Sequence, residues 1–194
     1  MRTAPSEGVK RHLQIALVLT LFSVPLQCAT LERLSLNDMI SKSTVIVRGS
    51  ITGSYAAFAS TGPVIYTHYS IQVSEWLKGL GGNTIDMVVP GGVVNNVGQS
   101  FSGAPTFRVG DQYVFFLWTS KAGLTQVIGL TQGLFSVAQD GSQDPVATRS
   151  ASHELMLDRG TGQPVKDQPL VMHMSELRSQ ISTTLAPLVP TVAK

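Results

Sequence analysis

A strict alternation of side-chain character over residues 65–74 constrains this chain more than any other feature of its sequence. In the segment IYTHYSIQVS, one parity holds Ile65, Thr67, Tyr69, Ile71 and Val73, and the other holds Tyr66, His68, Ser70, Gln72 and Ser74. A period of two residues is typical of a β-strand with one buried face. Such a strand needs partners in a sheet and a cover for its apolar face, so the sequence predicts a β-fold.

Further segments predict short strands that are separated by glycine-rich turns. They cover residues 44–51, 84–89, 113–118, 125–129, 133–138, 145–149 and 153–158. The run 113–118 (YVFFLW) is apolar throughout, which is typical of a strand buried on both faces. Because no helices alternate with these strands, we expect a mainly β fold, a sandwich or a barrel.

Two short helices are predicted at the ends of the β region. Ser35 and Asp38 form a capping-box pattern in front of an apolar stripe, which predicts a helix over 36–42. A second set of apolar residues recurs at helical spacing and consists of Met174, Leu177, Ile181 and Leu185. It predicts a helix over about 174–184, which we expect to pack on the outside of the β region.

Two long segments without a strand pattern are candidate contact surfaces. They are residues 53–63 and 91–107, which are rich in glycine and other small residues. Loops on a rigid scaffold carry binding residues more often than the elements they connect. The contacts expected there are Tyr55, Phe58, Asn95, Asn96 and Phe101. The alternative for Tyr55 and Phe58 is that they fold back over the end of a barrel.

Residues 1–29 have the pattern of a secretory signal peptide. Arg2, Lys10 and Arg11 supply a basic region, and residues 15–26 supply an apolar run of 12 residues that ends near Pro25. A run of that length is too short for a bilayer core, which needs about 20 residues. We therefore expect an exported protein, periplasmic or extracellular, with no stable membrane insertion after signal removal. An uncleaved membrane anchor is the alternative.

The chain has a single cysteine, Cys28, close to the expected cleavage point. One interpretation is a lipoprotein that carries a lipid on this residue, although Gln27 stands where that processing signal has glycine or alanine. The other is that Cys28 leaves with the signal peptide. In both cases no disulfide can form within one chain, so the folded part depends on its hydrophobic core.

Charge excludes one large class of partners. Residues 1–29 hold three of the 14 basic residues and one of the 12 acidic residues, so residues 30–194 are formally neutral. Nucleic-acid binding leaves a basic footprint, which is missing here. The polybasic segment that draws a protein to an anionic membrane is missing too.

No catalytic or metal-binding motif is complete in this sequence. His153-Glu154 begins a zinc-protease pattern, but Leu157 stands where the second histidine is needed. Residues 98–103 (GQSFSG) miss the serine-hydrolase elbow by one residue. We therefore expect no enzyme activity, no cofactor and no metal. The alternatives are a hydrolase whose site is assembled from distant residues such as His68 and His153, and a structural protein of the cell envelope.

The order of several motifs carries a family resemblance. These motifs are 36–49 (LNDMISKSTVIVRG), 73–79 (VSEWLKG), 86–92 (DMVVPGG), 107–117 (FRVGDQYVFFL) and 129–137 (GLTQGLFSV). Their order resembles a group of secreted, mostly uncharacterised bacterial β-domains, some of which are found beside matrixin-like metalloproteases. More distantly, it is similar to the netrin-like module of tissue inhibitors of metalloproteinases. The resemblance covers about 31–150 and implies an OB-like (netrin-like) barrel of five to seven strands with a short N-terminal helix.

The resemblance extends to the fold and not to inhibition. Those inhibitors use an N-terminal cysteine and several disulfides, whereas this chain has no cysteine after residue 28. We expect a signal peptide (1–29), a barrel domain (30–150), a C-terminal strand and helix (151–185) and a flexible tail (186–194). The function expected is that of an exported, non-catalytic binding or accessory module. Its partner is unknown, and the resemblance points to an association with a secreted protease.

Overall fold

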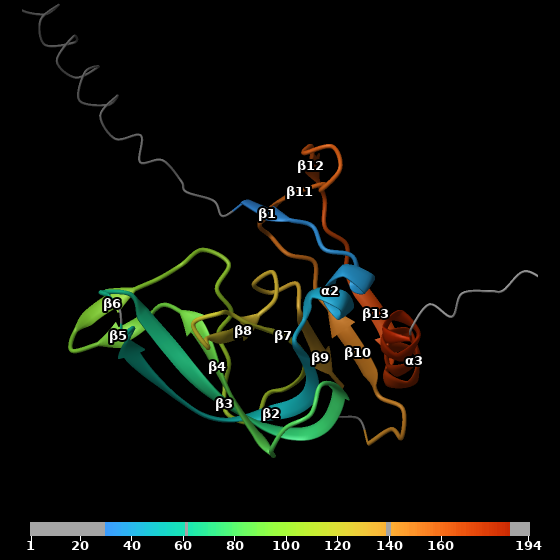
Figure 1. Cartoon of the computed structure of the whole chain (residues 1–194), viewed down its shortest axis with the longest axis horizontal. Coiled ribbons are helices and arrows are strands. Elements are labelled where there is room, and N and C mark those ends of the chain that lie inside the picture. The colour runs from blue at the N-terminus through green and yellow to red at the C-terminus, as the bar shows by residue number, and fades with distance from the viewer. Residues whose placement is uncertain (1–29, 61, 139–140, 187–194) are drawn as a thin grey trace, which may run out of the picture.

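The computed structural model describes residues 30–60, 62–138 and 141–186, and its centre is a curved, mainly antiparallel sheet of eight strands (Figure 1). These strands are β2 (Val45–Phe58), β3 (Ile65–Lys78), β4 (Thr84–Pro90), β7 (Gln112–Thr119), β8 (Thr125–Val127), β9 (Leu134–Val137), β10 (Val146–Arg149) and β13 (Leu170–His173). Their order is β13-β10-β9-β7-β2-β3-β4, and β8 pairs with β7 beside this path. The expected signal peptide and residues 187–194 of the expected tail lie outside the described residues.

Two smaller sheets and two helices complete the fold. The small sheets are β1 (Thr30–Glu32) with β11 (Leu155–Leu157) and β12 (Pro164–Val165), and the hairpin of β5 (Gly92–Val94) with β6 (Val97–Gln99). The helices are α2 (Leu36–Lys42) and α3 (Met174–Leu185). Figure 1 places the helices at one end of the main sheet and the hairpin at the opposite end. No helix in the described ranges is long and apolar enough to span a bilayer.

The main sheet is open, so the expected closed barrel is wrong. Its edges are β4 and β13, each paired with one neighbour in the described structure. The long β2–β3 pair contains three register shifts, and such bulges increase the twist and bend a sheet. Strand β4 curves round until Val89 lies near Val127 of β8. No ladder joins these two strands in the described part of the chain. The mainly β composition and the two flanking helices are confirmed.

Each face of the sheet buries its own hydrophobic cluster. On one face, Val114 and Phe116 of β7 pack with buried residues of α2 and α3. On the other, concave face, Phe115 and Leu117 pack with residues of β2, β3 and β4. All four side chains of β7 are fully buried. The prediction of a strand covered on both sides is therefore confirmed for residues 114–117, whereas Tyr113 is half-buried and Trp118 is 44% exposed.

The predicted helix over 36–42 forms with the capping box expected from the sequence. The backbone N–H of Asp38 donates to Ser35 Oγ at 3.0 Å, and the backbone N–H of Ser35 donates to the Asp38 carboxylate at 3.2 Å. At the other end, Lys78 Nζ donates to three carbonyls of residues 40–43, at 2.6 to 3.1 Å. The carbonyl groups that the helix end leaves unpaired are thereby satisfied. This contact also fixes α2 to β3.

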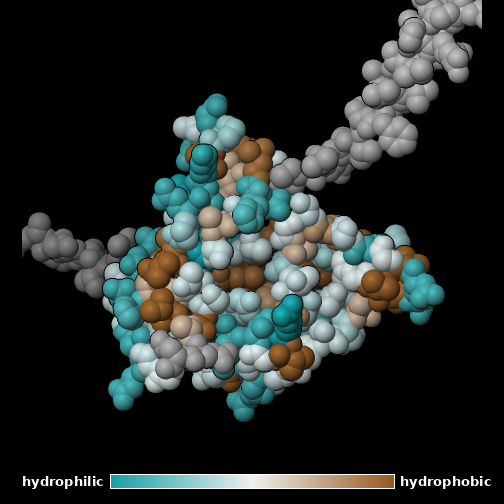
Figure 2. Space-filling view, turned by 180° about the vertical axis from the view of Figure 1, so that it is seen from behind, coloured by the Kyte–Doolittle hydropathy of each residue, from teal (hydrophilic) through white to brown (hydrophobic). Residues whose placement is uncertain are grey.

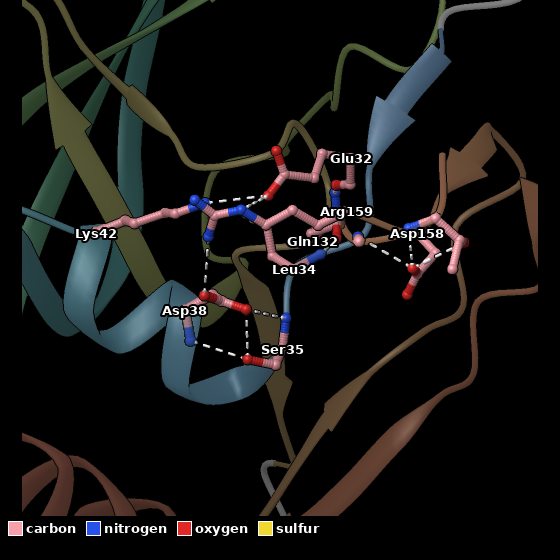
Figure 3. Close-up of polar contacts among 10 residues, drawn as sticks. Glu32, Leu34, Ser35, Asp38, Lys42, Gln132, Asp158 and Arg159 are labelled. Carbon is pink, nitrogen blue, oxygen red and sulfur yellow. Dashed lines mark hydrogen bonds and ion pairs between the residues drawn. The ribbon is translucent and has the colours of Figure 1, made fainter. Parts of the chain in front are cut away.

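The segment in front of α2 is anchored by a polar network (Figure 3). The buried Gln132 accepts from Leu34 N at 2.8 Å and donates to Glu32 O at 3.0 Å. The Glu32 carboxylate lies 3.2 Å from Lys42 Nζ and 3.5 Å from Arg159 Nε. Strand β1 also pairs in parallel with β11. Residues 30–34 are therefore part of the fold.

Several expected boundaries are wrong because tertiary pairing extends the strands. Residues 53–58, predicted as loop, belong to β2 and pair with β3 up to Phe58. Residues 92–99, also predicted as loop, form the β5–β6 hairpin. Besides β5 and β6 of this hairpin, the strands that the sequence did not predict are β1, β12 and β13. The helix predicted over 174–184 is confirmed as α3, which ends one residue later.

Candidate functional site

The end of the molecule farthest from the helices consists of the β5–β6 hairpin and the adjoining ends of β2 and β3, and we call it the tip (Figure 1). The side chain of Gln99 fixes the hairpin there. Its Oε1 accepts from Ile65 N at 2.7 Å and its Nε2 donates to Pro63 O at 2.6 Å. Thr67 Oγ1 adds a bond to Gly91 O at 2.8 Å. The hairpin is therefore attached to the sheet and is not a free loop.

Local backbone geometry explains two features of the hairpin sequence. Asn95 and Asn96 both have positive φ, 50° and 64°, which is the conformation that a two-residue type I′ turn requires and that asparagine tolerates. Gly92 has a φ of 140°, and a Cβ there would lie 2.7 Å from Thr67 Oγ1. Only glycine therefore lets the hairpin lie directly on β3. The two asparagines are exposed, and they also have a structural role that is sufficient to explain them.

The tip exposes large apolar side chains and carries no charge. Those exposed are Tyr55 (59%), Phe58 (43%), Val93 (68%), Val97 (49%) and Phe101 (45%). No Lys, Arg, Asp or Glu occurs in residues 49–74 or 87–107, which build this end of the molecule. Figure 2 shows the hairpin as a hydrophobic projection with a hydrophilic point, at the right-hand end of the view. Exposed apolar groups gathered in this way commonly mark an interaction surface.

Four of the five contact residues predicted from the sequence lie in the hairpin or on the side of the sheet that it covers, and Tyr55 lies on the opposite face. Tyr55 and Phe58 are three residues apart in one unbroken stretch of β2, so their side chains point to opposite faces of the sheet. Phe58 lies on the face that the hairpin covers, because it shares the parity of Ala56 and pairs with Ile65, and Gly92 of the hairpin packs against both of these residues. Asn95 and Asn96 form the turn of the hairpin. Phe101 follows the hairpin and passes close to Gly91, where a Cβ would lie 3.6 Å from its ring.

Tyr55 belongs to a small polar cluster on the outer face. Its ring stacks on His68, with 4.6 Å between the ring centroids and an interplanar angle of 6°. His68 Nδ1 lies 2.9 Å from Asp86 Oδ2. These three residues come from β2, β3 and β4, side by side in the sheet. This polar cluster, which includes the exposed Asp86 carboxylate, borders the uncharged tip on the outer face and is not part of it.

The segment 100–107 crosses the concave face of the sheet and divides it. Phe107 inserts between Tyr69 and Tyr113, with centroid distances of 5.0 and 5.5 Å and edge-to-face geometry. On the tip side of this crossing lies a pocket of about 180 Å³ between β3, β4 and Phe101. On the other side lies a larger groove of about 450 Å³. Sequence reasoning found neither cavity, because both depend on how this segment folds back.

The larger groove has a floor of small polar side chains. Tyr113, Ser136 and Thr148 lie next to one another across β7, β9 and β10. Its complete lining is Gly103, Ala104, Tyr113, Thr131, Leu134, Ser136, Thr148, Ser150, Ala151, Ser152, His153 and Glu154. Burial, reinforced by the charge of Asp111, raises the pKa of the Tyr113 hydroxyl above its usual range. The hydroxyl therefore stays protonated and able to donate at neutral pH.

A buried ion pair holds one wall of this groove. Arg149 and Asp167 form a bidentate pair at 2.7 and 2.9 Å, and both side chains are almost completely buried. Asp167 also accepts from Ser152 N at 2.8 Å. Burial alone would raise the pKa of Asp167, but the bonds from Arg149 and Ser152 outweigh it and hold that pKa below its usual value. The wall 150–154 is thus tied to the segment before β13.

The catalytic arrangements considered from the sequence, a serine nucleophile at Ser102 and a pair of His68 with His153, are not assembled in the described residues. Ser102 Oγ lies 3.4 Å from the Glu154 carboxylate with no histidine between them, whereas a serine nucleophile needs a base within hydrogen-bond reach. His68 is on the outer face of β3, and His153 is on the rim of the groove on the concave side. No group of three or more His, Cys, Asp or Glu side chains in the described ranges is placed to hold a metal ion.

Comparisons of this chain with protein-family models, with curated proteins and with solved structures found no match.

Proposed function

We propose that this protein is an exported, non-catalytic binding or accessory module that contacts an uncharged surface of a partner through its tip. The observation that carries the proposal is the combination of exposed apolar side chains and absent charge at one end of the fold. An interface core is depleted in charged residues and enriched in aromatic ones, as the tip is. The two charge-free segments, residues 49–74 and 87–107, supply the strands and the hairpin of this surface.

The rigidity of the tip supports a binding role. The two hydrogen bonds of the Gln99 side chain and the type I′ turn fix the positions of Val93 and Val97 in the unbound protein. Binding through a preorganised surface avoids the free-energy cost of ordering loops on association. The proposed partner is an exported protein with a complementary apolar patch, and a secreted protease is the class that the family resemblance suggests. The OB-like, netrin-like relationship is part of this proposal, supported by the short helix α2 in front of the first long strand.

The contact surface is tested by capture with matched variants. The purified protein is immobilised and exposed to the exported proteins of its host, and bound species are identified by mass spectrometry. We expect a stoichiometric partner to bind the wild type and to be lost from Val93→Ser/Val97→Ser. The control is Val171→Ser, because Val171 is as exposed as Val93 (64% against 68%) but lies on β13 at the other end of the sheet. Equal capture by tip and control variants, or no partner at all, would refute the proposed surface.

Export is tested separately by the mass of the protein recovered outside the cytoplasm. We expect a processed chain that begins near Thr30, because the apolar run before it has the length of a signal peptide. The network around Gln132 would then hold the new N-terminal strand in the fold. Recovery of the intact chain in the cytoplasm contradicts the exported assignment and leaves the tip open to a cytoplasmic partner.

A further inference from the structure

The groove on the concave face has a chemistry different from that of the tip. Its volume of about 450 Å³ falls in the usual range for ligand sites, which is roughly 300–1,000 Å³. In the described part of the chain, the hydroxyl groups of Tyr113, Thr131, Thr148 and Ser150 have no hydrogen-bond partner in the protein. Each hydroxyl offers one donor and two acceptor positions. The groove therefore presents an array of unused hydrogen-bonding groups.

The lining is poor in groups that bind anions. No Lys or Arg lines the groove, and its ionisable side chains besides Tyr113 are His153 and Glu154 at the rim, so it offers no fixed positive charge for a phosphate, a carboxylate or a nucleic acid. The Glu154 carboxylate faces Ser102 and Gly103. This chemistry favours a neutral ligand that carries several hydroxyl groups and can lie along a β-sheet.

From this geometry we infer that the groove is a binding site for a neutral oligosaccharide. Tyr113, Ser136 and Thr148 stand on adjacent strands, which are about 4.8 Å apart in a sheet. Ser136 Oγ donates to Thr148 O at 3.0 Å, so toward a ligand it acts as an acceptor. That repeat is comparable to the length of one pyranose unit, so successive sugars can meet successive hydroxyl-bearing side chains. Leu134 and Ala104 supply apolar surface for the faces of the sugar rings. The Arg149–Asp167 pair positions the wall through its bond to Ser152.

This inference does not rest on the proposed function, because the groove and the tip lie on opposite sides of the 100–107 crossing. Its test is saturation-transfer NMR on the purified protein with cellotriose, maltotriose and tri-N-acetylchitotriose, titrated to about 10 mM. The anionic probe is trigalacturonate. The variants are Thr148→Val and Tyr113→Phe, each of which removes one hydroxyl and keeps the shape. Their controls are Thr84→Val on β4 and Tyr66→Phe on the outer face of β3.

We expect at least one neutral triose to bind the wild type and both controls with the same affinity. Each groove variant should bind about fivefold more weakly, because one hydrogen bond contributes about 1 kcal/mol. Trigalacturonate should bind more weakly than the neutral sugars. Binding of no neutral triose, equal binding by the groove and control variants, or a preference for trigalacturonate would each overturn the inference. Circular dichroism is used to check that each variant is folded. The tip variant Val93→Ser/Val97→Ser should retain sugar binding whether or not the proposed function of the tip is correct.

Discussion

At the scale of single residues, the Arg149–Asp167 pair is the most consequential polar contact of the fold. Replacing Asp167 with Asn leaves a buried guanidinium without its counter-charge. Breaking a buried pair in this way costs about 3–5 kcal/mol, so we expect Asp167→Asn to lower the free energy of unfolding by about 3 kcal/mol. Urea denaturation at pH 7 measures this loss. The control is Asp86→Asn at the exposed His68 pair, which should cost at most about 1 kcal/mol.

The same pair predicts a pH dependence of known sign. Because the pKa of Asp167 is lower in the folded state than in the unfolded state, the folded protein binds fewer protons. The stabilisation is therefore present above the ordinary carboxyl pKa of about 3.9 and is lost as the pH falls through the lowered value. We expect the stability difference between wild type and Asp167→Asn to shrink below about pH 4. A difference that stays constant from pH 7 to pH 3 contradicts this assignment.

Gln99 is the residue that attaches the tip to the sheet. Changing Gln99 to Met keeps its length but removes both bonds, to Ile65 N and to Pro63 O. We expect amide hydrogen exchange in residues 92–99 to become at least about tenfold faster, while global stability falls by only about 1–2 kcal/mol. Exchange in β7 serves as the internal control. If hydrogen exchange in residues 92–99 does not change, the contacts of Gly91 and Gly92 with β3 are sufficient to hold the hairpin.

At the scale of elements, the first helix tests how strongly local sequence determines this fold. The Ser35 hydroxyl caps α2 by accepting from Asp38 N, so Ser35→Ala should lower stability by about 1 kcal/mol. Ser35→Thr keeps the hydroxyl that accepts from Asp38 N and donates to the Asp38 carboxylate, and it should recover most of the loss. Thermal unfolding of the two variants measures the effect. A loss with Ser35→Thr as large as that with Ser35→Ala means that the cap is not the cause.

Elements defined by neighbouring residues could be predicted from the sequence, and elements defined by distant pairing could not. The helix over 36–42 depends on a capping box and a stripe within eight residues, and it forms as predicted. Residues 53–58 consist mainly of small side chains with weak strand preference, and only their pairing with β3 makes them a strand. The hairpin 92–99 had a readable signal, because Asn-Asn between valines is typical of a type I′ turn. The glycines around it favoured a loop instead.

At the scale of the whole molecule, the candidate sites also depend on pairing between distant residues, which the sequence does not reveal. The exposed aromatic residues of the tip could be found from loop composition, although their distribution over two faces of the sheet could not. The groove brings Tyr113, Ser136 and Thr148 together through strand register, and no spacing in the sequence reveals register between β7, β9 and β10. Closure of the barrel also requires the two edge strands to pair with each other, and in the described structure β4 pairs only with β3 and β13 only with β10.

The C-terminal part belongs to the same folding unit as the β region. Three residues of α3 that are almost completely buried in the helix-side core are Met174, Leu177 and Ile181. Strand β13 is an integral strand of the main sheet, because it pairs with β10 over four residues. Burial of three such side chains contributes about 6 kcal/mol, which is comparable to the whole stability of a typical domain, about 5–15 kcal/mol. The chain should therefore unfold in one cooperative transition.

Shortening the chain tests this cooperativity. A protein that ends at residue 150 lacks α3, β13 and the Asp167 counter-charge, so we expect it to lose its near-ultraviolet circular dichroism and to expose apolar surface to a dye. A protein that covers residues 30–186 keeps every described element and should show one thermal transition that coincides in near- and far-ultraviolet signals. Cooperative unfolding of the 30–150 protein would show that the β region folds by itself. The contacts of α3 and β13 would then add stability to a sheet that folds without them, and the groove wall 150–154 could be replaced without loss of the fold.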